Sequence, residues 1–382
     1  MNTPSGISIV IPTEGRTSLT IALIEQLYGL RERVEFPSEV LIIDSSQTDT
    51  QQKILIACEH YDAIFIPGSP NVRSKRNAGI KHARFSIILF LDSDCTPSEN
   101  LLTEHWKYYE NHPGLLISGV LGKLEFTGPK TLAWYLVEHS SMVRHFDIAE
   151  KPTYVRWGPT ANLSVRRDVL IEIGLFDENF PFKLGGDDLD LTYRITQSGR
   201  SLIYNPFAIA LHSRSTWNSI SAVLGRAMRW GRMEYHLYKK HKALRVHHPP
   251  TLFAWFIAIC VLFLICGFVF EYSLFLLFPI VWLFLATSLF SFISALQNPG
   301  SYTDKFSSFK ENVLSTIPEL TYQVGSSLEF LRHGDLRFFY SRPLLSVGET
   351  KGSWIPEAIN TWSNLLALLI CYSLMIILIG QS

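Results

Sequence analysis

Cysteine is scarce in this chain, and its few cysteines follow neither a disulfide framework nor a zinc-binding spacing. They stand at Cys58, Cys95, Cys260, Cys266 and Cys371, and no two of them form a Cys-x-x-Cys pair. This pattern argues against a disulfide-stapled domain and against a zinc site. Cys95 directly follows an aspartate, and we expect it to be a small packing residue rather than a nucleophile.

An excess of charge of one sign is also missing, because 34 lysines and arginines balance 34 aspartates and glutamates. Such a balance gives no long-range attraction to nucleic acid, so a nucleic-acid partner is not expected. We also find no internal repeat and no leader of basic and then apolar residues before Ile7. Without such a leader, the first part of the chain is expected to stay in the cytosol.

Charged residues thin out in the last third of the chain, where apolar runs occupy residues 252–270, 273–293 and 365–379. Runs of this length cross a bilayer as helices, although the third run is short. The alternative for the first two runs is a buried core helix. The basic residues directly before the first run are Lys239, Lys240, Lys242 and Arg245. They favour a cytoplasmic start, a hairpin of two spans and a third span that leaves the C-terminus outside.

These runs divide the chain into four parts. We predict a catalytic domain over residues 1–245, a transmembrane hairpin over 246–296, a cytoplasmic interfacial segment over 297–360 and a third transmembrane helix over 361–382. Residues 306–340 favour either an amphipathic helix on the membrane surface or a plain solvent-facing helix. The expected protein is a multi-pass protein of the cell inner membrane with a cytoplasmic catalytic domain.

Strand-like and helix-like segments alternate in the first part of the chain. Strands are predicted over residues 7–11, 40–43, 63–66 and 86–91, and helices over 17–30, 48–60 and 73–83. This alternation with short connections predicts an α/β fold with a parallel sheet and helices on its faces. Beyond residue 115 the order is less regular, with strands predicted over 115–124 and 162–165 and helices over 134–145 and 187–197.

Polar loops follow three of the predicted strands, at Pro12–Arg16, Asp44–Ser46 and Asp92–Asp94. Such loops build the ligand site of an α/β sheet, so we expect these residues to face one cleft. Asp92 and Asp94 form an oxygen-rich pair suited to Mg²⁺ or Mn²⁺, which commonly binds through a substrate's phosphates. The alternative is an Asp-x-Asp motif that caps a helix.

A second acidic pair, Asp187 and Asp188, opens the predicted helix over residues 187–197 after two glycines. Adjacent carboxylates can have different environments and different pKa values, so one of them can serve as a general base. The alternative is that both acids stabilise the N-terminus of the helix.

Taken in order, these pieces resemble the family 2 glycosyltransferases, which have a GT-A fold. The matching segments are residues 9–13, 43–44, 48–50, 76–79, 92–94, 162–167, 174–178 and 185–190. They extend over most of the predicted catalytic domain. The resemblance implies inverting transfer of a sugar from a nucleotide-sugar donor, usually with Mg²⁺ or Mn²⁺.

The same resemblance implies roles for the acidic residues. Asp188 corresponds to the general base, and Asp187 stands where relatives carry a glutamate. Asp94 is placed on the metal, with Asp92 on the metal or on the donor ribose. His212 matches a position where some relatives supply a third metal ligand, and a structural histidine is the alternative.

For the donor, the resemblance implies contacts from Pro12, Thr13, Glu14, Asp44 and Arg76. A serine follows Asp44 where relatives usually have a second aspartate, which leaves the base open, with a UDP-sugar favoured. Three basic residues of the predicted helix over 73–83 are expected on its solvated face: Arg73, Lys75 and Lys81.

Arg226, Arg229 and Trp230 resemble the (Gln/Arg)-x-x-Arg-Trp motif of membrane-bound synthases that make polysaccharides or glycolipids. Arg229 offers a fork for a diphosphate, and Trp230 offers a flat face for a sugar ring. The alternative is a basic amphipathic helix whose arginines face anionic lipid head groups.

The sequence therefore predicts an inverting glycosyltransferase that moves a sugar to a lipid-linked or membrane-proximal saccharide acceptor in cell-envelope glycolipid or polysaccharide biosynthesis. One alternative is a processive polysaccharide synthase, although three spans are few for a channel. A second alternative is a non-catalytic membrane module that binds a nucleotide sugar.

Overall fold

The computed structural model describes residues 4–343 and 363–374, apart from 112–116, 139, 145, 147, 182–184, 248, 271–276, 297–301 and 372. The chain divides into two compact units. Of the described residues, the first unit holds those in 4–129 and 146–216, and the second holds those in 130–144, 217–343 and 363–374. This division does not test the functional boundary predicted at residue 245, which stays a prediction.

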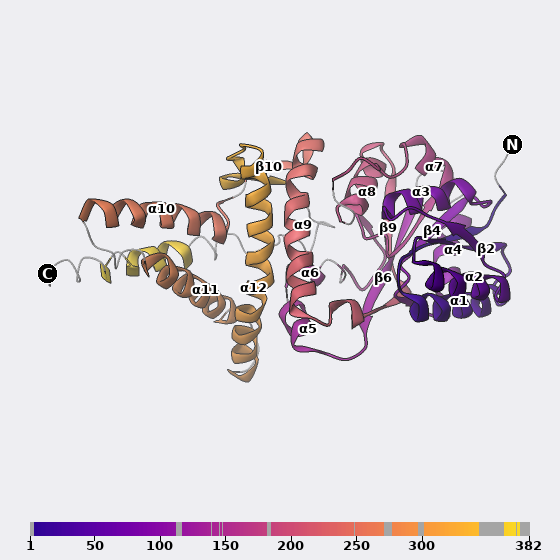
Figure 1. Ribbon diagram of the computed structural model, residues 1–382, viewed down its shortest axis with the longest axis horizontal. Coiled ribbons are helices and arrows are strands. Elements are labelled where there is room, and N and C mark those ends of the chain that lie inside the picture. Colours follow the sequence, from indigo (N-terminus) through magenta and orange to yellow (C-terminus); the bar gives the residue numbers. More distant parts are fainter. Residues whose placement is uncertain are drawn as a thin grey trace. The chain divides into compact units, whose positions relative to one another are not determined.

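The first unit is built on a nine-stranded mixed sheet (Figure 1). Its strands are β1 (Ile7–Thr13), β2 (Ser38–Asp44), β3 (Ile64–Pro67), β4 (Ile87–Leu91), β5 (Cys95–Pro97), β6 (Ile117–Thr127), β7 (Thr153–Val155), β8 (Asn162–Arg166) and β9 (Ser201–Ser213). They lie in the order β3-β2-β1-β4-β8-β6-β9-β5, and β7 pairs with β9 outside this path. The helices are α1 (Thr17–Arg31), α2 (Thr48–His60), α3 (Val72–His82), α4 (Leu101–Asn111), α7 (Arg167–Glu172) and α8 (Asp187–Gln197).

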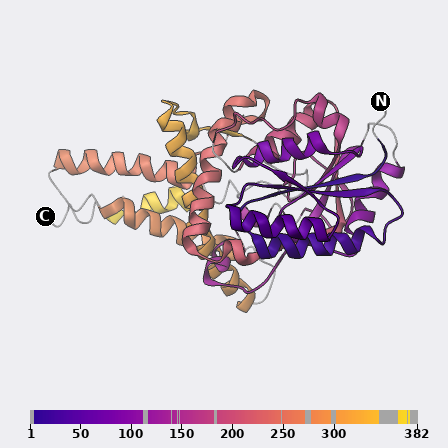
Figure 2. The ribbon, with the colours of Figure 1, turned by 45° about the vertical axis from the view of Figure 1, so that its right-hand side comes forward.

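The parallel half of the sheet follows from strands whose apolar residues are buried on both faces. β1 pairs in parallel with β2 and β4, and β2 pairs in parallel with β3. Ile9 and Ile11 belong to the core that includes side chains of α1 and α2, whereas Val10 meets Gly79 of α3. A Cβ at Gly79 would lie 2.3 Å from Val10 Cγ1, so glycine permits the close approach of α3. Helices therefore cover both faces, as Figures 1 and 2 show.

The predicted α/β class and the predicted parallel sheet are confirmed for β1 to β4. The remainder is mixed, because β8 runs antiparallel to both β4 and β6. The segment predicted as one or two strands over 115–124 is a single long strand, β6. β5 pairs antiparallel with β9, and this pairing puts Cys95 opposite His212.

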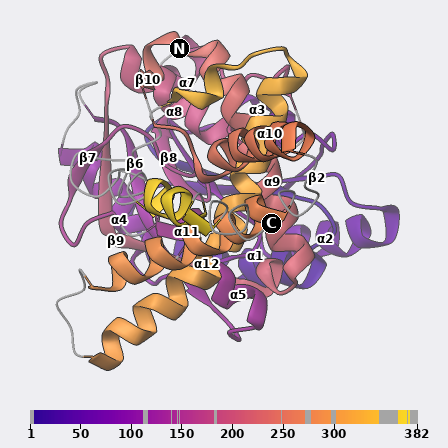
Figure 3. The ribbon, with the colours of Figure 1, turned by 90° about the vertical axis from the view of Figure 1, so that its left-hand side faces the viewer.

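The second unit is mainly helical (Figures 1 and 3). Its helices are α5 (Leu132–Val137), α6 (Ser141–Arg144), α9 (Ile220–Lys240), α10 (Leu252–Phe270), α11 (Phe278–Leu296) and α12 (Tyr302–Arg332), and residues 363–371 are also helical. Short 3₁₀ turns lie at Arg214–Trp217, Lys242–Leu244 and Arg337–Phe339, and β10 (Arg245–His247) pairs antiparallel with β11 (Ser341–Pro343). The helix predicted over 134–145 was therefore wrong in extent, because α5 and α6 are separate and Ser140 between them is not helical.

Helices α9 and α12 cross closely at two glycines. A Cβ at Gly231 would lie 1.9 Å from the carbonyl oxygen of Tyr322, and one at Gly325 would lie 2.3 Å from that of Met228. Neither backbone oxygen can yield easily, so these positions accept only glycine at this separation. The helix predicted within residues 306–340 corresponds to α12, which contains Pro318.

The apolar runs form helices, but these helices differ in whether they are long and apolar enough to span a bilayer. Among the described residues, Phe278–Leu296 is the one helix long and apolar enough to span a bilayer, and Leu252–Cys266 is a shorter apolar stretch. The third run is described only in part, at residues 363–371 and 373–374. The three transmembrane spans and the membrane location therefore stay predictions.

Candidate active site

The loop after β4 places two of the predicted site residues at the edge where the parallel strands end. Asp92, Ser93 and Asp94 form a tight turn, because the Cys95 amide donates to the Asp92 carbonyl oxygen at 3.1 Å. The chain then enters β5 beside β9, where the Ser213 amide donates to the Asp94 carbonyl oxygen at 2.9 Å. This pairing fixes the Asp94 side chain next to the end of β9.

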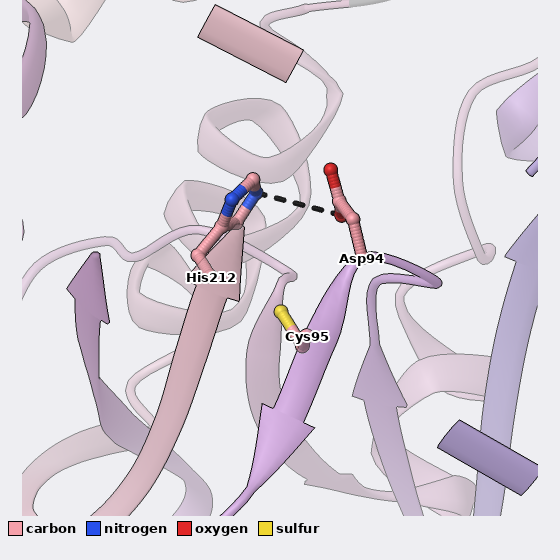
Figure 4. Close-up of side chains that lie close together, drawn as sticks. All are labelled: Asp94, Cys95 and His212. Atoms are coloured by element: carbon pink, nitrogen blue, oxygen red, sulfur yellow. Dashed lines mark ion pairs between the residues drawn. The ribbon is translucent and has the colours of Figure 1, made fainter. Parts of the chain in front are cut away.

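Asp94 and His212 point toward the same space from neighbouring strands, with Cys95 beside them (Figure 4). Asp94 Oδ1 lies 3.6 Å from His212 Nε2. The ligand atoms of all three residues lie within 4.8 Å of one another, and all three residues are buried. They form a compact group of the kind that can hold a metal ion.

The donor set of Asp94 and His212 fits a divalent cation. Asp94 Oδ1 is buried and has no hydrogen-bond partner, although a buried carboxylate oxygen normally has one. His212 Nδ1 lies 3.2 Å from the Ser213 carbonyl oxygen, which can only accept, so Nδ1 carries the proton. Nε2 is then left with its lone pair toward Asp94. A free carboxylate oxygen and a free imidazole nitrogen are the atoms a metal needs.

Cys95 does not share this role. Its Sγ lies 3.7 Å from the Ala161 carbonyl oxygen, the geometry of a buried thiol that donates weakly. Burial, followed by the charges of Asp92 and Asp94, raises the pKa of the Cys95 thiol well above its ordinary value. A thiol that stays protonated is a poor metal ligand, which agrees with a packing role.

Asp92 lies outside the group of Asp94, Cys95 and His212. Its side chain is 30% exposed, and Oδ1 lies 3.3 Å from Arg76 Nη2. The same arginine donates from Nη1 to Asp187 Oδ2 at 2.5 Å. Arg76 thus joins the acid after β4 to the acidic pair that opens α8. The two acidic motifs, which lie about ninety residues apart in the sequence, therefore meet at one edge of the sheet.

Arg73 strengthens the link between α3 and the start of α8. Its guanidinium donates to the carbonyl oxygens of Phe180 and Gly185 and lies 3.8 Å from Asp187 Oδ1. Asp187 also accepts from the Gly185 amide at 3.2 Å. The first acid of the pair is consequently held by two arginines.

The expectation that Arg73 and Lys75 lie on a solvated helix face was wrong, whereas Lys81 is exposed as expected. Arg73 is fully buried and Lys75 is 3% exposed. The reason is that the first turns of α3 lie beside the loops at the strand ends, where Arg73 contacts the start of α8 and Lys75 contacts the loop after β1. Burial lowers the pKa of Lys75, and the Glu14 charge opposes that effect.

Asp188 stands in a different environment from Asp187, although the two are adjacent. No arginine is paired with Asp188 among the ion pairs of the described residues, and its Oδ1 accepts from the Leu189 amide at 2.9 Å. Burial, followed by the neighbouring Asp187 charge, raises the pKa of Asp188 to about 7. A carboxyl group that titrates near neutral pH is suited to accept a proton.

The predicted donor residues of the first loops also lie side by side. Thr13 at the end of β1 is in register with Asp44 at the end of β2. The Asp44 carboxylate accepts from the Ser46 hydroxyl at 2.6 Å and from its amide at 3.0 Å. Lys75 Nζ donates to the Thr13 carbonyl oxygen at 2.7 Å and lies 3.5 Å from Glu14. Pro12 lies within β1, directly before Thr13.

Arg229 and Trp230 lie on α9 in the second unit. The Trp230 ring is 6.1 Å from that of Trp217, and the Arg226 guanidinium lies 3.8 Å over the Trp217 ring. These contacts hold the motif within its own unit. Its predicted contact with the donor stays a prediction.

Arg16 was not singled out by the sequence, although it lies in the first polar loop. Its Nη1 is 2.9 Å from Asp94 Oδ2. In the sequence, its position at the end of a polar loop that follows a strand was the feature that could have marked it as a site residue. The residue is an ordinary loop arginine until the fold brings Asp94 beside it.

One family model matches a part of the first unit. Residues 8–174 match the model described as Glycosyl transferase family 2. The match and the mixed sheet together support the GT-A-like fold that the resemblance implied.

Several curated proteins are similar to this chain at low identity. The pre-mycofactocin glycosyltransferase of Mycobacterium tuberculosis is 26% identical over 223 residues, covering 56% of this chain and 45% of that protein. Glycosyltransferase AglE of Haloferax volcanii is 26% identical over 178 residues, covering 46% and 56%. Chondroitin synthase of Pasteurella multocida is 23% identical over 239 residues, covering 52% and 24%. The chain spans about half the length of the first two of these relatives.

Among solved structures, GalNAc-T7 with UDP, GalNAc and Mn²⁺ is 15% identical to this chain, with a TM-score of 0.45. The match covers 62% of this chain and 48% of that one.

Proposed function

We propose that this chain is an inverting, metal-dependent glycosyltransferase that moves a sugar from a nucleotide-sugar donor to a lipid-linked or membrane-proximal acceptor. The main support is that the two acidic motifs lie together at one edge of the sheet, where Arg76 contacts both Asp92 and Asp187. A UDP-sugar is the favoured donor, and Mg²⁺ or Mn²⁺ is the favoured ion.

In this mechanism, Asp94 and His212 would hold the cation, with Asp92 near the cation or near the donor ribose. When bound, the cation supplies positive charge to the diphosphate leaving group. Arg76 stays next to Asp92 and adds a fixed guanidinium on the same side. Thr13, Glu14 and Asp44 form the wall where the nucleoside is expected.

Asp188 is the proposed general base. It accepts the proton of the acceptor hydroxyl while that oxygen bonds to C1 of the sugar and the bond from C1 to the diphosphate breaks. Attack from the face opposite the leaving group inverts the configuration at C1. Asp187, held by Arg76 and Arg73, fixes the start of α8 and thereby orients Asp188. Its negative charge also helps to keep the pKa of Asp188 raised.

The acceptor side of the proposal rests on the apolar helices. Helices α10 and α11 expose large apolar side chains, with Phe268 at 87% and Phe284 at 70% exposure. Exposed apolar surface of this kind calls for a covering layer, and a lipid bilayer fits a helix as long and apolar as Phe278–Leu296. A catalytic domain on the cytoplasmic side of the inner membrane would then meet lipid-linked acceptors, with Arg229 and Trp230 close to their head groups.

The test is an assay of nucleotide release and product formation by membranes that contain the full chain. UDP-, GDP- and dTDP-sugars are supplied in turn, followed by mass analysis of the lipid-extractable product. Transfer should stop when divalent metal is chelated, and Asp188→Asn should lower it by roughly 10²–10⁴-fold because the general base is lost. Full activity of Asp188→Asn, or activity that persists without metal, would refute the mechanism.

A matched control is available in the same unit. Asp168 opens α7 as Asp188 opens α8, and its Oδ1 likewise accepts from the next amide, at 2.8 Å. It is exposed and lies outside the acidic site. Asp168→Asn should leave transfer near the wild-type level, which separates loss of the base from loss of a helix-start aspartate.

A processive polysaccharide synthase is the second candidate, and the similarity to chondroitin synthase favours it. The length of the product distinguishes the two: one added sugar supports single transfer, whereas long chains support processive synthesis. Binding of a donor without any turnover would instead support a non-catalytic module.

A further inference from the structure

Arg16 is paired with Asp94 of the candidate metal centre, and the proposed mechanism leaves it without a role. It lies between the loop after β1 and the first residue of α1. Its Nη1 is 2.9 Å from Asp94 Oδ2, and its side chain is 39% exposed whereas that of Asp94 is 2% exposed. A partly exposed arginine therefore neutralises a buried carboxylate.

Asp94 requires a positive partner because an ionised carboxylate is costly to bury alone. Arg16 occupies one of its two oxygens, and the other faces His212 without a hydrogen bond. A divalent cation held by Asp94 and His212 would meet the same requirement. Arg16 and the cation would then be like charges on one carboxylate, which disfavours both being there together.

The surroundings of Arg16 allow it to leave. Its side chain does not cap α1, and no heavy atom lies within 4 Å of a Cβ built at Gly15, the preceding residue. The loop is held by other bonds, from the Gly15 amide to Ser46 Oγ at 2.8 Å and from Lys75 Nζ to the Thr13 carbonyl oxygen at 2.7 Å. The guanidinium can therefore change partner while the loop keeps its shape.

We propose that Arg16 is an exchangeable counter-ion of the active site. It neutralises Asp94 while the site lacks a divalent metal, releases Asp94 when the metal binds, and then donates to the diphosphate of the nucleotide. A guanidinium matches phosphate oxygens with paired hydrogen bonds, so the displaced side chain gains a strong new partner. This inference rests on the proposed function and adds a donor-binding residue to it.

The proposed exchange predicts that loss of Arg16 changes the affinities for Mn²⁺ and for the nucleotide in opposite directions. Arg16→Gln removes the competitor for Asp94, so Mn²⁺ alone should bind more tightly. The same change removes a phosphate contact, so a nucleoside diphosphate in the presence of Mn²⁺ should bind more weakly. A purely structural arginine would weaken both, and an incidental surface contact would change neither.

The experiment uses the full chain purified in detergent. Mn²⁺ binding is followed by the electron paramagnetic resonance of the free ion, and UDP, GDP and dTDP are then titrated by calorimetry at saturating Mn²⁺. For Arg16→Gln we expect Mn²⁺ to bind about 3- to 10-fold more tightly and the best nucleotide to bind about tenfold more weakly.

Two control variants sharpen the result. Arg33→Gln makes the same change of charge at an exposed residue beyond the far end of α1, about 20 Å away by helix length, and should match the wild type in both titrations. Arg16→Lys keeps the charge but loses the planar fork. It should bind Mn²⁺ like the wild type and the nucleotide with intermediate affinity.

The outcomes separate this proposal from the function on which it rests. If the wild-type chain binds both probes but Arg16→Gln shifts them in the same direction, or shifts neither, the exchange is refuted and the glycosyltransferase proposal stands. If the wild-type chain binds neither Mn²⁺ nor any of the three nucleotides, both proposals are overturned.

Discussion

Both units of this protein bury charged residues, but they satisfy them differently. In the second unit, Arg342 donates to both oxygens of Glu234, at 2.5 and 2.8 Å, and Glu329 is bonded by Arg232 and His236. Every oxygen of these two carboxylates has a partner.

In the first unit two acidic side chains of the candidate site are left incomplete. Asp94 has an oxygen without a hydrogen bond, and Asp188 has no cation paired with it among the described ion pairs. We call the pairs of Glu234 with Arg342 and of Glu329 with Arg232 and His236 closed pairs, because both carboxylate oxygens already have partners and none is left for a ligand. Asp94 and Asp188 in the first unit can still accept one. Buried charge therefore indicates a functional site where its partners are missing, not merely where it occurs.

The largest expected effect tests the closed pairs. Glu234→Gln should lower the free energy of unfolding by about 3 kcal/mol, because it leaves the largely buried guanidinium of Arg342 without its carboxylate partner. Thermal unfolding of the purified chain measures the loss. The double variant Glu234→Gln with Arg342→Met should recover part of it. Unchanged stability in the single variant would mean that the closed pair is not structural.

The next effect tests the open carboxylate of Asp94. His212→Gln should weaken Mn²⁺ binding roughly 10- to 100-fold, because the imidazole nitrogen directed at Asp94 is lost. Titration with Mn²⁺ gives the affinity. His105→Gln is a poor control because His105 bonds to Asn162 and Ser164 in the core. His82→Gln, at an exposed histidine of α3, should bind Mn²⁺ normally. Equal affinity in His212→Gln and the wild type would assign His212 a structural role.

The third prediction concerns the titration of Asp188. Its pKa is raised in the folded chain to about 7, so the native state holds the proton more tightly than the unfolded state does. Stability is then lost as pH rises from the unfolded pKa, near 4, through the folded one. Asp188→Asn should therefore stabilise the fold by about 1–3 kcal/mol at pH 8 and by less at pH 5.

The same titration should appear in catalysis, because the base must be ionised to accept a proton. The kcat/KM of the wild-type enzyme is expected to rise with pH through about 7 and to fall roughly tenfold for each pH unit below it. A profile that stays flat between pH 5 and pH 8, together with no gain of stability in Asp188→Asn, would show that Asp188 is an ordinary surface carboxylate.

The smallest effect tests whether Cys95 belongs to the metal centre. Cys95→Ala should leave Mn²⁺ affinity unchanged and lower the free energy of unfolding by about 1 kcal/mol, since a small buried side chain is shortened. Mn²⁺ titration and thermal unfolding check the two parts. A large loss of Mn²⁺ affinity would make the thiol a ligand and would remove the distinction between Cys95 and His212.

Much of the first unit could be predicted because its information is local. Apolar β-branched runs such as 7–11 and 40–43 predicted strands β1 and β2, and helical spacing between them predicted α1. The acidic motifs could be found because each follows a strand or opens a helix. In contrast, residues 134–145 were predicted as one helix, since a local pattern does not reveal where packing interrupts it.

The sequence by itself determined the kinds of chemical group available, the order of the parallel strands along the chain and the presence of long apolar helices. Tertiary structure alone decided which charges meet. Arg73 and Lys75 became buried because the start of α3 lies beside the loops at the strand ends, Arg16 came to face Asp94, and the pairing of β5 with β9 brought His212 beside the acidic loop. The physical reason is that secondary structure depends on neighbours within a few residues, whereas the partner of a buried charge is chosen by packing between segments far apart in the chain.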